Sequence, residues 1–185
     1  MASHHLHSLP SKASDRTDFR PEDDTTFRLA QLLLLLDVLE KQDWITSLER
    51  LGVMDFFAAH PFLVITKGEH DYKRLMLLGF SARSLTYASP GQRFVTRRSR
   101  LQHDLSLLVA YGLTRVDVNQ GSIIYVITPK GKELSDQLNS LYAQSYRTSV
   151  EIIGARIKSL SDTKLQDRCR EWLHADPSLL DILNV

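Results

Sequence analysis

The strongest candidates for chemistry in this sequence are four arginines that lie close together: Arg93, Arg97, Arg98 and Arg100. A guanidinium group presents several N–H donors in a planar fork that matches phosphate and carboxylate oxygens. Three of the four are predicted in the first turn of a helix near 97–110, where the helix dipole favours an anion and opposes a cation. We therefore expect a reason other than helix stability for this cluster.

Three interpretations of the arginine cluster remain open from the sequence. The side chains could contact phosphates and base edges in a DNA major groove. They could instead pair with acidic side chains of a partner subunit, because arginine is a preferred interface residue. In the third interpretation they are only the solvated start of a helix.

No other residue set predicts catalysis. His103 and Asp104 are adjacent, but neighbouring residues of a helix point about 100° apart, so the two side chains should not converge on one site. The sequence contains no glycine loop ending in Lys-Ser or Lys-Thr, no His-Glu-x-x-His pattern and no serine elbow. We predict a protein without catalytic activity, cofactor or metal.

The elements around the cluster follow a recognisable order. A helix is predicted over 97–110 and should end at Gly112, which favours a left-handed stop. Two short strands rich in β-branched residues follow, joined by a turn at 119–121. Thr128 should then cap a new helix whose first residue is proline. Helix, hairpin and helix in this order are typical of a winged helix-turn-helix.

The preceding residues are expected to complete that domain. Residues 1–20 carry no periodic apolar pattern and are interpreted as a flexible arm. Helices are predicted over 27–41, capped by Thr25, and over 44–59, capped by Asp43. Together with an insertion at 61–95 they would form a winged-helix domain spanning 21–128. The predicted fold class is α+β, mostly α.

A helical extension is predicted for the C-terminal part, 129–185. It should begin with one long helix to about Lys158, followed by a helix that Ser161 caps and a short one after Pro177. A helix of that length cannot pack entirely on a small domain, so part of its apolar stripe should meet another chain. The predicted partner-facing residues are Leu134, Leu138, Leu141, Tyr142, Val150, Ile153 and Ile157.

Composition limits the class of protein further. The chain has 185 residues, 43% of them hydrophobic, and a net charge of +1, which argues against a protein that coats nucleic acid with its whole surface. Cys169 is the only cysteine, so an intracellular protein without disulfides is expected. The apolar run 29–39 is too short to span a bilayer, and no secretory signal pattern opens the chain. We predict a cytoplasmic protein that does not interact with membranes.

Three strings carry a resemblance to a known family: LERLGVMDFFAAHPFLV, SLTYASPGQRFVTRRSRLQHDLSLLVAYGL and YVITPKGKEL. Their succession resembles the middle component of bacterial ABC-three-component systems, the Lamassu-type anti-phage operons. The resemblance runs from about Asp43 to Trp172. It includes the LxSLYAQSY segment and the LSDTKL cap that follows it.

The resemblance implies a non-enzymatic subunit with two protein partners. One is an ATPase similar to structural-maintenance-of-chromosomes (SMC) proteins, and the other is an effector that is often a nuclease. The subunit would join the two and help to hold the effector inactive until foreign DNA is sensed. The resemblance assigns no contact residues, and it leaves open whether the subunit touches DNA within the complex.

A free-standing winged-helix transcription regulator is the alternative function. Such a regulator is normally a symmetric dimer that spaces two recognition helices about one DNA turn apart. The insertion at 61–95 and the modest net charge argue against it. The fold alone cannot separate the two functions.

Overall fold

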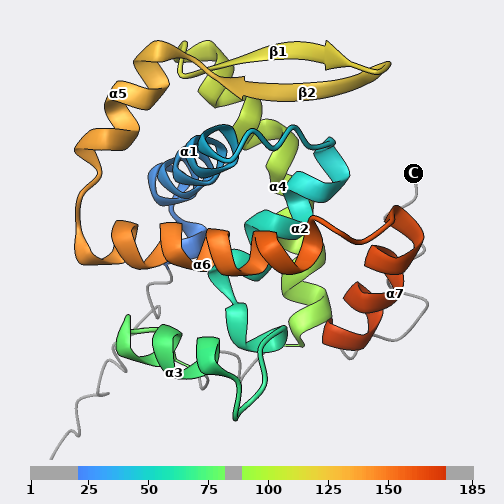
Figure 1. The fold of residues 1–185 in the computed structure, drawn as a ribbon. Helices are drawn as coiled ribbons and strands as arrows, with labels where there is room; N and C mark the ends of the chain where they lie inside the picture. The colour runs from blue at the N-terminus through green and yellow to red at the C-terminus, as the bar shows by residue number, and fades with distance from the viewer. Residues whose placement is uncertain (1–20, 82–88, 174–185) are drawn as a thin grey trace, which may run out of the picture.

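Seven α-helices, two short 3-10 helices and one β-hairpin make up the part of the chain that the computed structural model describes, residues 21–81 and 89–173 (Figure 1). The predicted class, α+β and mostly α, is confirmed. The predicted arm at 1–20 and the predicted helix after Pro177 lie outside the described residues. Among the described residues, no helix combines the length and the apolar character needed to cross a membrane.

The elements have the following bounds, in chain order: η1 (Pro21–Asp23), α1 (Thr25–Lys41), α2 (Leu48–Ala59), η2 (Pro61–Leu63), α3 (His70–Leu77), α4 (Pro90–Ala110), β1 (Thr114–Asn119), β2 (Ser122–Ile127), α5 (Pro129–Gln137), α6 (Leu141–Ile157) and α7 (Asp162–Leu173).

Helix α1 forms the centre of the fold. Its residues from Gln31 to Leu39 are all buried, and it contacts α4, α5, α6 and strand β2. Figure 1 shows it enclosed between the hairpin and α6. The predicted cap was one residue late, because the Asp24 carboxylate, not Thr25, accepts the backbone N–H of Phe27 at 2.9 Å. A helix buried around its whole circumference explains why its leucines show no single apolar face.

Helix α2 is shorter than predicted. It begins at Leu48 with Ser47 as its N-cap, rather than after Asp43. Asp43 has a φ of +50° in the turn that follows α1, where its N–H donates to the carbonyl of Glu40. Residues 42–47 connect α1 to α2, and Pro61 follows the end of α2 as predicted.

Helix α4 begins earlier than predicted, at Pro90 instead of near residue 97. Proline suits the first helical position, because its missing N–H would have no partner there. The three arginines that were predicted in the first turn, Arg97, Arg98 and Arg100, are therefore the eighth, ninth and eleventh residues of the helix, so the argument from the helix dipole does not apply to them. The helix ends as predicted, with Gly112 at a φ of +69°.

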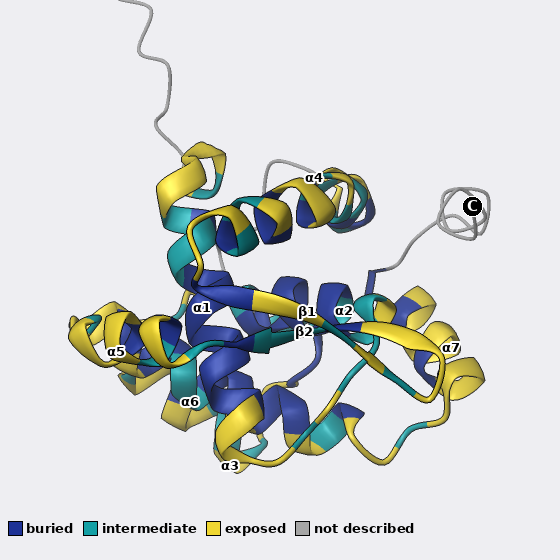
Figure 2. Cartoon of the chain, turned by 90° about the horizontal axis from the view of Figure 1, so that it is seen from above, coloured by how far each residue is buried: buried dark blue, intermediate teal, exposed yellow. Residues whose placement is uncertain are grey.

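The hairpin β1–β2 crosses above α1 and α2 (Figure 1, Figure 2). The strands pair antiparallel, and the turn at Gln120 and Gly121 has positive φ at both residues, as a tight hairpin turn requires. Ile124 and Ile127 are both buried, and Ile127 is part of the hydrophobic core. Towards the tip of the hairpin, Val118 and Ile123 are exposed.

The prediction of one long helix over 129–158 is wrong, because the structure contains two helices there, α5 and α6. Thr128 caps α5 as predicted, accepting the N–H of Gly131. Ser140 then caps α6 by accepting the N–H of Ala143. Arg147 donates to the carbonyls of Ser135 and Leu138 at the end of α5, and the Ser135 carbonyl also accepts the N–H of Leu138. The break is thus stabilised on both sides.

Candidate functional site

Arg97, a predicted contact residue, is buried inside the domain. Its Nε and Nη2 donate to both carboxylate oxygens of Asp55 in α2, at 2.5 and 2.7 Å, and Nη2 also donates to Gln31 in α1 at 2.7 Å. Burial opposes the charge of Arg97, but Asp55 more than offsets this, so the pKa of Arg97 is raised. The expectation that Arg97 faces DNA or a partner is corrected: it holds α1, α2 and α4 together.

A second buried ion pair lies beside it and was missed from the sequence. Arg28 in α1 donates to both oxygens of Asp104 in α4, at 2.7 and 3.0 Å. His103 is exposed, so the prediction that it and Asp104 point apart is confirmed. No local signal marks Asp104 as a buried partner, because Arg28 is 76 positions away in the chain.

Arg98 lies against the backbone of α2 rather than in solvent. Its Nη1 donates to the carbonyls of Leu48 at 3.1 Å and Glu49 at 2.8 Å. Gly52 permits this approach, because a Cβ there would lie 2.1 Å from Nη1. Arg98 also borders a cavity of about 250 Å³, and Cys169 forms part of the wall of this cavity. Its role in the structure is to join α4 to α2.

Arg93 and Arg100 lie on the outer side of α4 and pair with the short helix η1. Arg93 Nη2 is 2.7 Å from Glu22 Oε1, and Arg100 Nη1 is 3.2 Å from Asp23 Oδ1. Arg100 is the more exposed of these two, at 41% of its side chain against 19% for Arg93. Each of the four is therefore bonded within this chain.

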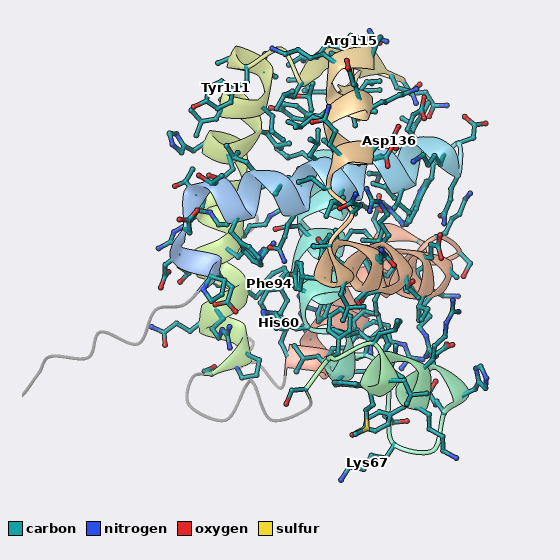
Figure 3. All side chains as sticks on the ribbon, turned by 90° about the vertical axis from the view of Figure 1, so that its left-hand side faces the viewer. His60, Lys67, Phe94, Tyr111, Arg115 and Asp136 are labelled. Atoms are coloured by element: carbon teal, nitrogen blue, oxygen red, sulfur yellow. The ribbon has the colours of Figure 1, made fainter. Side chains whose placement is uncertain are left out.

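These pairs line a cavity of about 280 Å³ between η1, α1, α2 and α4. His60 forms part of its wall, and the ring of Phe56 lies 4.8 Å from the His60 ring. The Phe56 ring also packs against Phe94 of α4, with centroids 5.2 Å apart; His60 and Phe94 are labelled in Figure 3. Burial, and then the charges of Arg93 and Arg97, lower the pKa of His60 to about 3. The imidazole is neutral at physiological pH, in a positively charged environment.

A chain of polar contacts leads from Arg97 towards the surface. Gln31, which accepts from Arg97, donates to the hydroxyl of Tyr142 in α6. The Tyr142 ring stacks on that of Tyr146, with centroids 6.1 Å apart. Arg97 Nη1 and the Tyr146 hydroxyl are buried without a hydrogen-bond partner within the described residues. Tyr142 itself is 42% exposed, so this network reaches solvent at the start of α6.

The predicted partner-facing stripe divides into a buried part and an exposed part. Val150, Ile153 and Ile157 are buried in the core, where α6 contacts α1 and α2, so they are not available to a partner. That part of the prediction is corrected, because α6 packs on this chain's own helices. Leu138 is half-buried against the core. We call the exposed remainder the junction patch: Leu134, Leu141 and Tyr142.

A second exposed apolar group was not predicted as a site. Val118 pairs with Ile123 across the hairpin, and Val116 pairs with Tyr125 on the same face. Val116, Val118 and Ile123 are 50%, 66% and 56% exposed. We call these three residues the hairpin patch. Alternation of apolar residues in each strand could have indicated this face, but not that it is left uncovered.

The described residues hold no group of three or more histidine, cysteine or acidic side chains that could bind a metal ion. Cys169 is buried, and burial raises the pKa of its thiol to about 12, which makes it a poor nucleophile.

A comparison with protein-family models gives the family of this chain. The model of the family described as "ABC-three component (ABC-3C) system Middle Component 2" matches residues 83–175, half of the chain. This chain belongs to that family. The matched region begins just before α4 and continues through α7. Searches of curated proteins and of solved structures found no match.

Proposed function

We propose that this chain is the non-catalytic subunit of a Lamassu-type anti-phage complex, joining an SMC-like ATPase to an effector that is often a nuclease. Family membership carries the proposal, because a middle component is one part of an ABC-three-component system. The finer assignment draws on the resemblance of the three sequence strings. A non-catalytic role agrees with the divergence of His103 from the buried Asp104.

Two separated apolar patches support a joining role. The hairpin patch lies near the tip of β1–β2, whereas the junction patch lies where α5 gives way to α6. These two places are on opposite sides of the molecule (Figure 1, Figure 2). Single exposed apolar residues are ordinary on a soluble protein, but several on one face of a hairpin indicate an interaction surface. A subunit that joins two proteins needs two such surfaces.

Helices α1, α2 and α4 with the hairpin β1–β2 are proposed to form a winged helix that binds protein. The exposed positions of α4 carry uncharged side chains such as Gln92, Thr96, Ser99 and Gln102, while Arg93 and Arg100 are only partly exposed. Proteins that bind DNA neutralise phosphates with lysine and arginine, which account for much of their affinity. Because Arg93, Arg97, Arg98 and Arg100 are bonded within the chain, the transcription-regulator alternative has less support than the complex subunit.

The hairpin patch can be tested by changing Val118 and Ile123 together to Asp and co-purifying the tagged full-length chain with the ATPase and effector of its operon. Both side chains point to solvent, so the variant should fold while losing one partner. The matched control is Leu77→Asp in α3, where the leucine is 90% exposed. It should leave co-purification unchanged.

Loss of one partner in the double variant, with the other retained, supports the joining role. Undiminished recovery of both partners would remove the hairpin patch from the proposal. Equal loss in the double variant and in Leu77→Asp would show that any added surface charge has this effect.

A further inference from the structure

The cavity beside α4 is surrounded by two layers of ion pairs with different exposure. The inner layer is Arg97 with Asp55 and Arg28 with Asp104, and every side chain in it is buried. The outer layer is Arg93 with Glu22 and Arg100 with Asp23, where the four side chains are between 19% and 65% exposed. Pairs that water reaches contribute little to stability, so the outer layer can exchange partners while the inner layer keeps the fold intact.

The short helix η1 contacts the arginines through its main chain as well as its carboxylates. Arg28 Nη1 donates to the carbonyl of Glu22 at 3.3 Å and to the carbonyl of Asp23 at 3.1 Å. The same two residues give their carboxylates to Arg93 and Arg100. The site therefore binds two consecutive acidic residues at four points, two on the backbone and two on the side chains.

We propose that Arg93, Arg100 and Arg28 form a docking site for a short acidic peptide segment of a partner subunit, and that Glu22 and Asp23 occupy this site in the free chain. The proposal rests on the proposed function, which supplies the partner. Arg93 and Arg100 are two helical turns apart, about 10 Å along α4, so an extended peptide can reach both. Displacing η1 would leave their charges without these carboxylates.

A peptide fits this site better than a nucleic acid does. Arg28 binds peptide carbonyl oxygens, which the phosphodiester backbone does not have in that arrangement. The neutral His60 in the cavity wall adds no charge for a phosphate, since the adjacent arginines and burial keep its pKa at about 3. Charge complementarity and the acidic segment already seated there both indicate an acidic peptide.

The test uses the synthetic peptide acetyl-Pro-Glu-Asp-Asp-amide, whose residues repeat 21–24, titrated into the isotope-labelled full-length chain and followed by NMR. The variant E22Q/D23N weakens the internal occupant. We expect it to bind the peptide about fivefold to tenfold more tightly than the unmodified chain, with shifts centred on Arg93, Thr96 and Arg100. The control peptide acetyl-Pro-Gln-Asn-Asn-amide should cause no saturable shifts.

A variant with the arginines replaced, R93Q/R100Q, should lose these shifts while the buried ion pairs and the helical circular dichroism remain. Saturable binding that is unchanged in R93Q/R100Q, or no binding to E22Q/D23N, overturns the proposal. The proposal is also overturned if duplex DNA shifts the NMR signals of Arg93, Thr96 and Arg100 and the peptide does not.

The proposed function and the proposed docking site can be tested separately. If R93Q/R100Q assembles with the ATPase and the effector as well as the unmodified chain does, the partner role of the site is overturned and the joining role stands. If E22Q/D23N instead strengthens assembly, both are supported.

Discussion

Arg97 and Asp55 test whether the arginine cluster is structural. Changing Arg97 to Met leaves the Asp55 carboxylate buried without its partner, so we expect the free energy of unfolding to fall by about 3–5 kcal/mol. Arg100→Ala, which removes a partly exposed pair, should cost no more than about 1 kcal/mol. Urea unfolding of both variants measures the difference. Equal small losses would contradict the assignment of Arg97 to the core.

The double variant Arg97→Met with Asp55→Leu provides the internal check. Removing both charges leaves no uncompensated ion, so this variant should be more stable than Arg97→Met alone. A double variant at least as unstable as the sum of the two single changes would show that Arg97 and Asp55 are not energetically coupled.

His60 should make stability depend on pH. Its pKa is about 3 in the folded chain and 6.5 when unperturbed, so the unfolded state binds more protons between these values. The contribution of neutral His60 is therefore fully present above about pH 6.5 and is lost as the pH falls towards 3. Between pH 7 and pH 5 we expect a loss of about 2 kcal/mol from this group.

The measurement compares the pH dependence of the unfolding free energy in the unmodified chain and in His60→Gln. Glutamine does not titrate, so the gap between the two proteins should narrow as the pH falls from 7 to 5. Parallel curves would mean that His60 titrates in the folded chain much as it does in the unfolded one.

At the level of elements, Gly131 sets how closely α5 approaches the end of α4. A Cβ at this position would lie 2.1 Å from the carbonyl oxygen of Leu113 and 2.8 Å from Ile127 Cγ1. Because the first obstacle is backbone, Gly131→Ala must displace α5, and we expect a loss of about 1–3 kcal/mol. Thermal or urea unfolding measures it.

Gly52→Ala is the matched control for Gly131→Ala. Its obstacle is the guanidinium end of Arg98, which can move into solvent, and alanine also favours the interior of α2 by about 1 kcal/mol. The net loss should be smaller than for Gly131→Ala. The reverse order would contradict the explanation by backbone contact.

Local sequence signals predicted some helix ends and turns correctly, but they failed where contacts with distant residues determine the boundary of an element. Gly112, the turn at 119–121 and the Thr128 cap depend on their own backbone chemistry, and the structure places them as expected. The break before Ser140 depends partly on Arg147 reaching back to α5, a contact that helical periodicity does not show. The start of α4 at Pro90 was missed because the predicted helix was taken to begin at the basic cluster near residue 97.

The candidate site followed the same rule. The sequence marked Arg93, Arg97, Arg98 and Arg100 as a cluster, but their exposure depends on partners far away in the chain. Asp55 lies 42 positions from Arg97, and Glu22 lies 71 positions from Arg93. The sequence alone does not distinguish a buried ion pair from an exposed one. The difference in exposure comes from the packing of α1 and α2 on α4.

In the whole molecule, the N-terminal helices and the family-matched region form one core. The match covers residues 83–175, yet α4 within it depends on Asp55 from α2 and on Arg28 and Gln31 from α1. A fragment containing only the matched region would expose these buried charges without their partners. The middle component therefore presents its hairpin and its α5–α6 junction from a scaffold that includes α1 and α2.

The most direct test of the joining role is an omission experiment. The proposed partners, an ATPase and an effector, are mixed with and without this full-length chain, and their association is measured by size-exclusion chromatography with light scattering. The account predicts one complex of all three proteins, and no association of the ATPase with the effector when this chain is left out. An ATPase–effector complex that forms equally well without it would contradict the joining role.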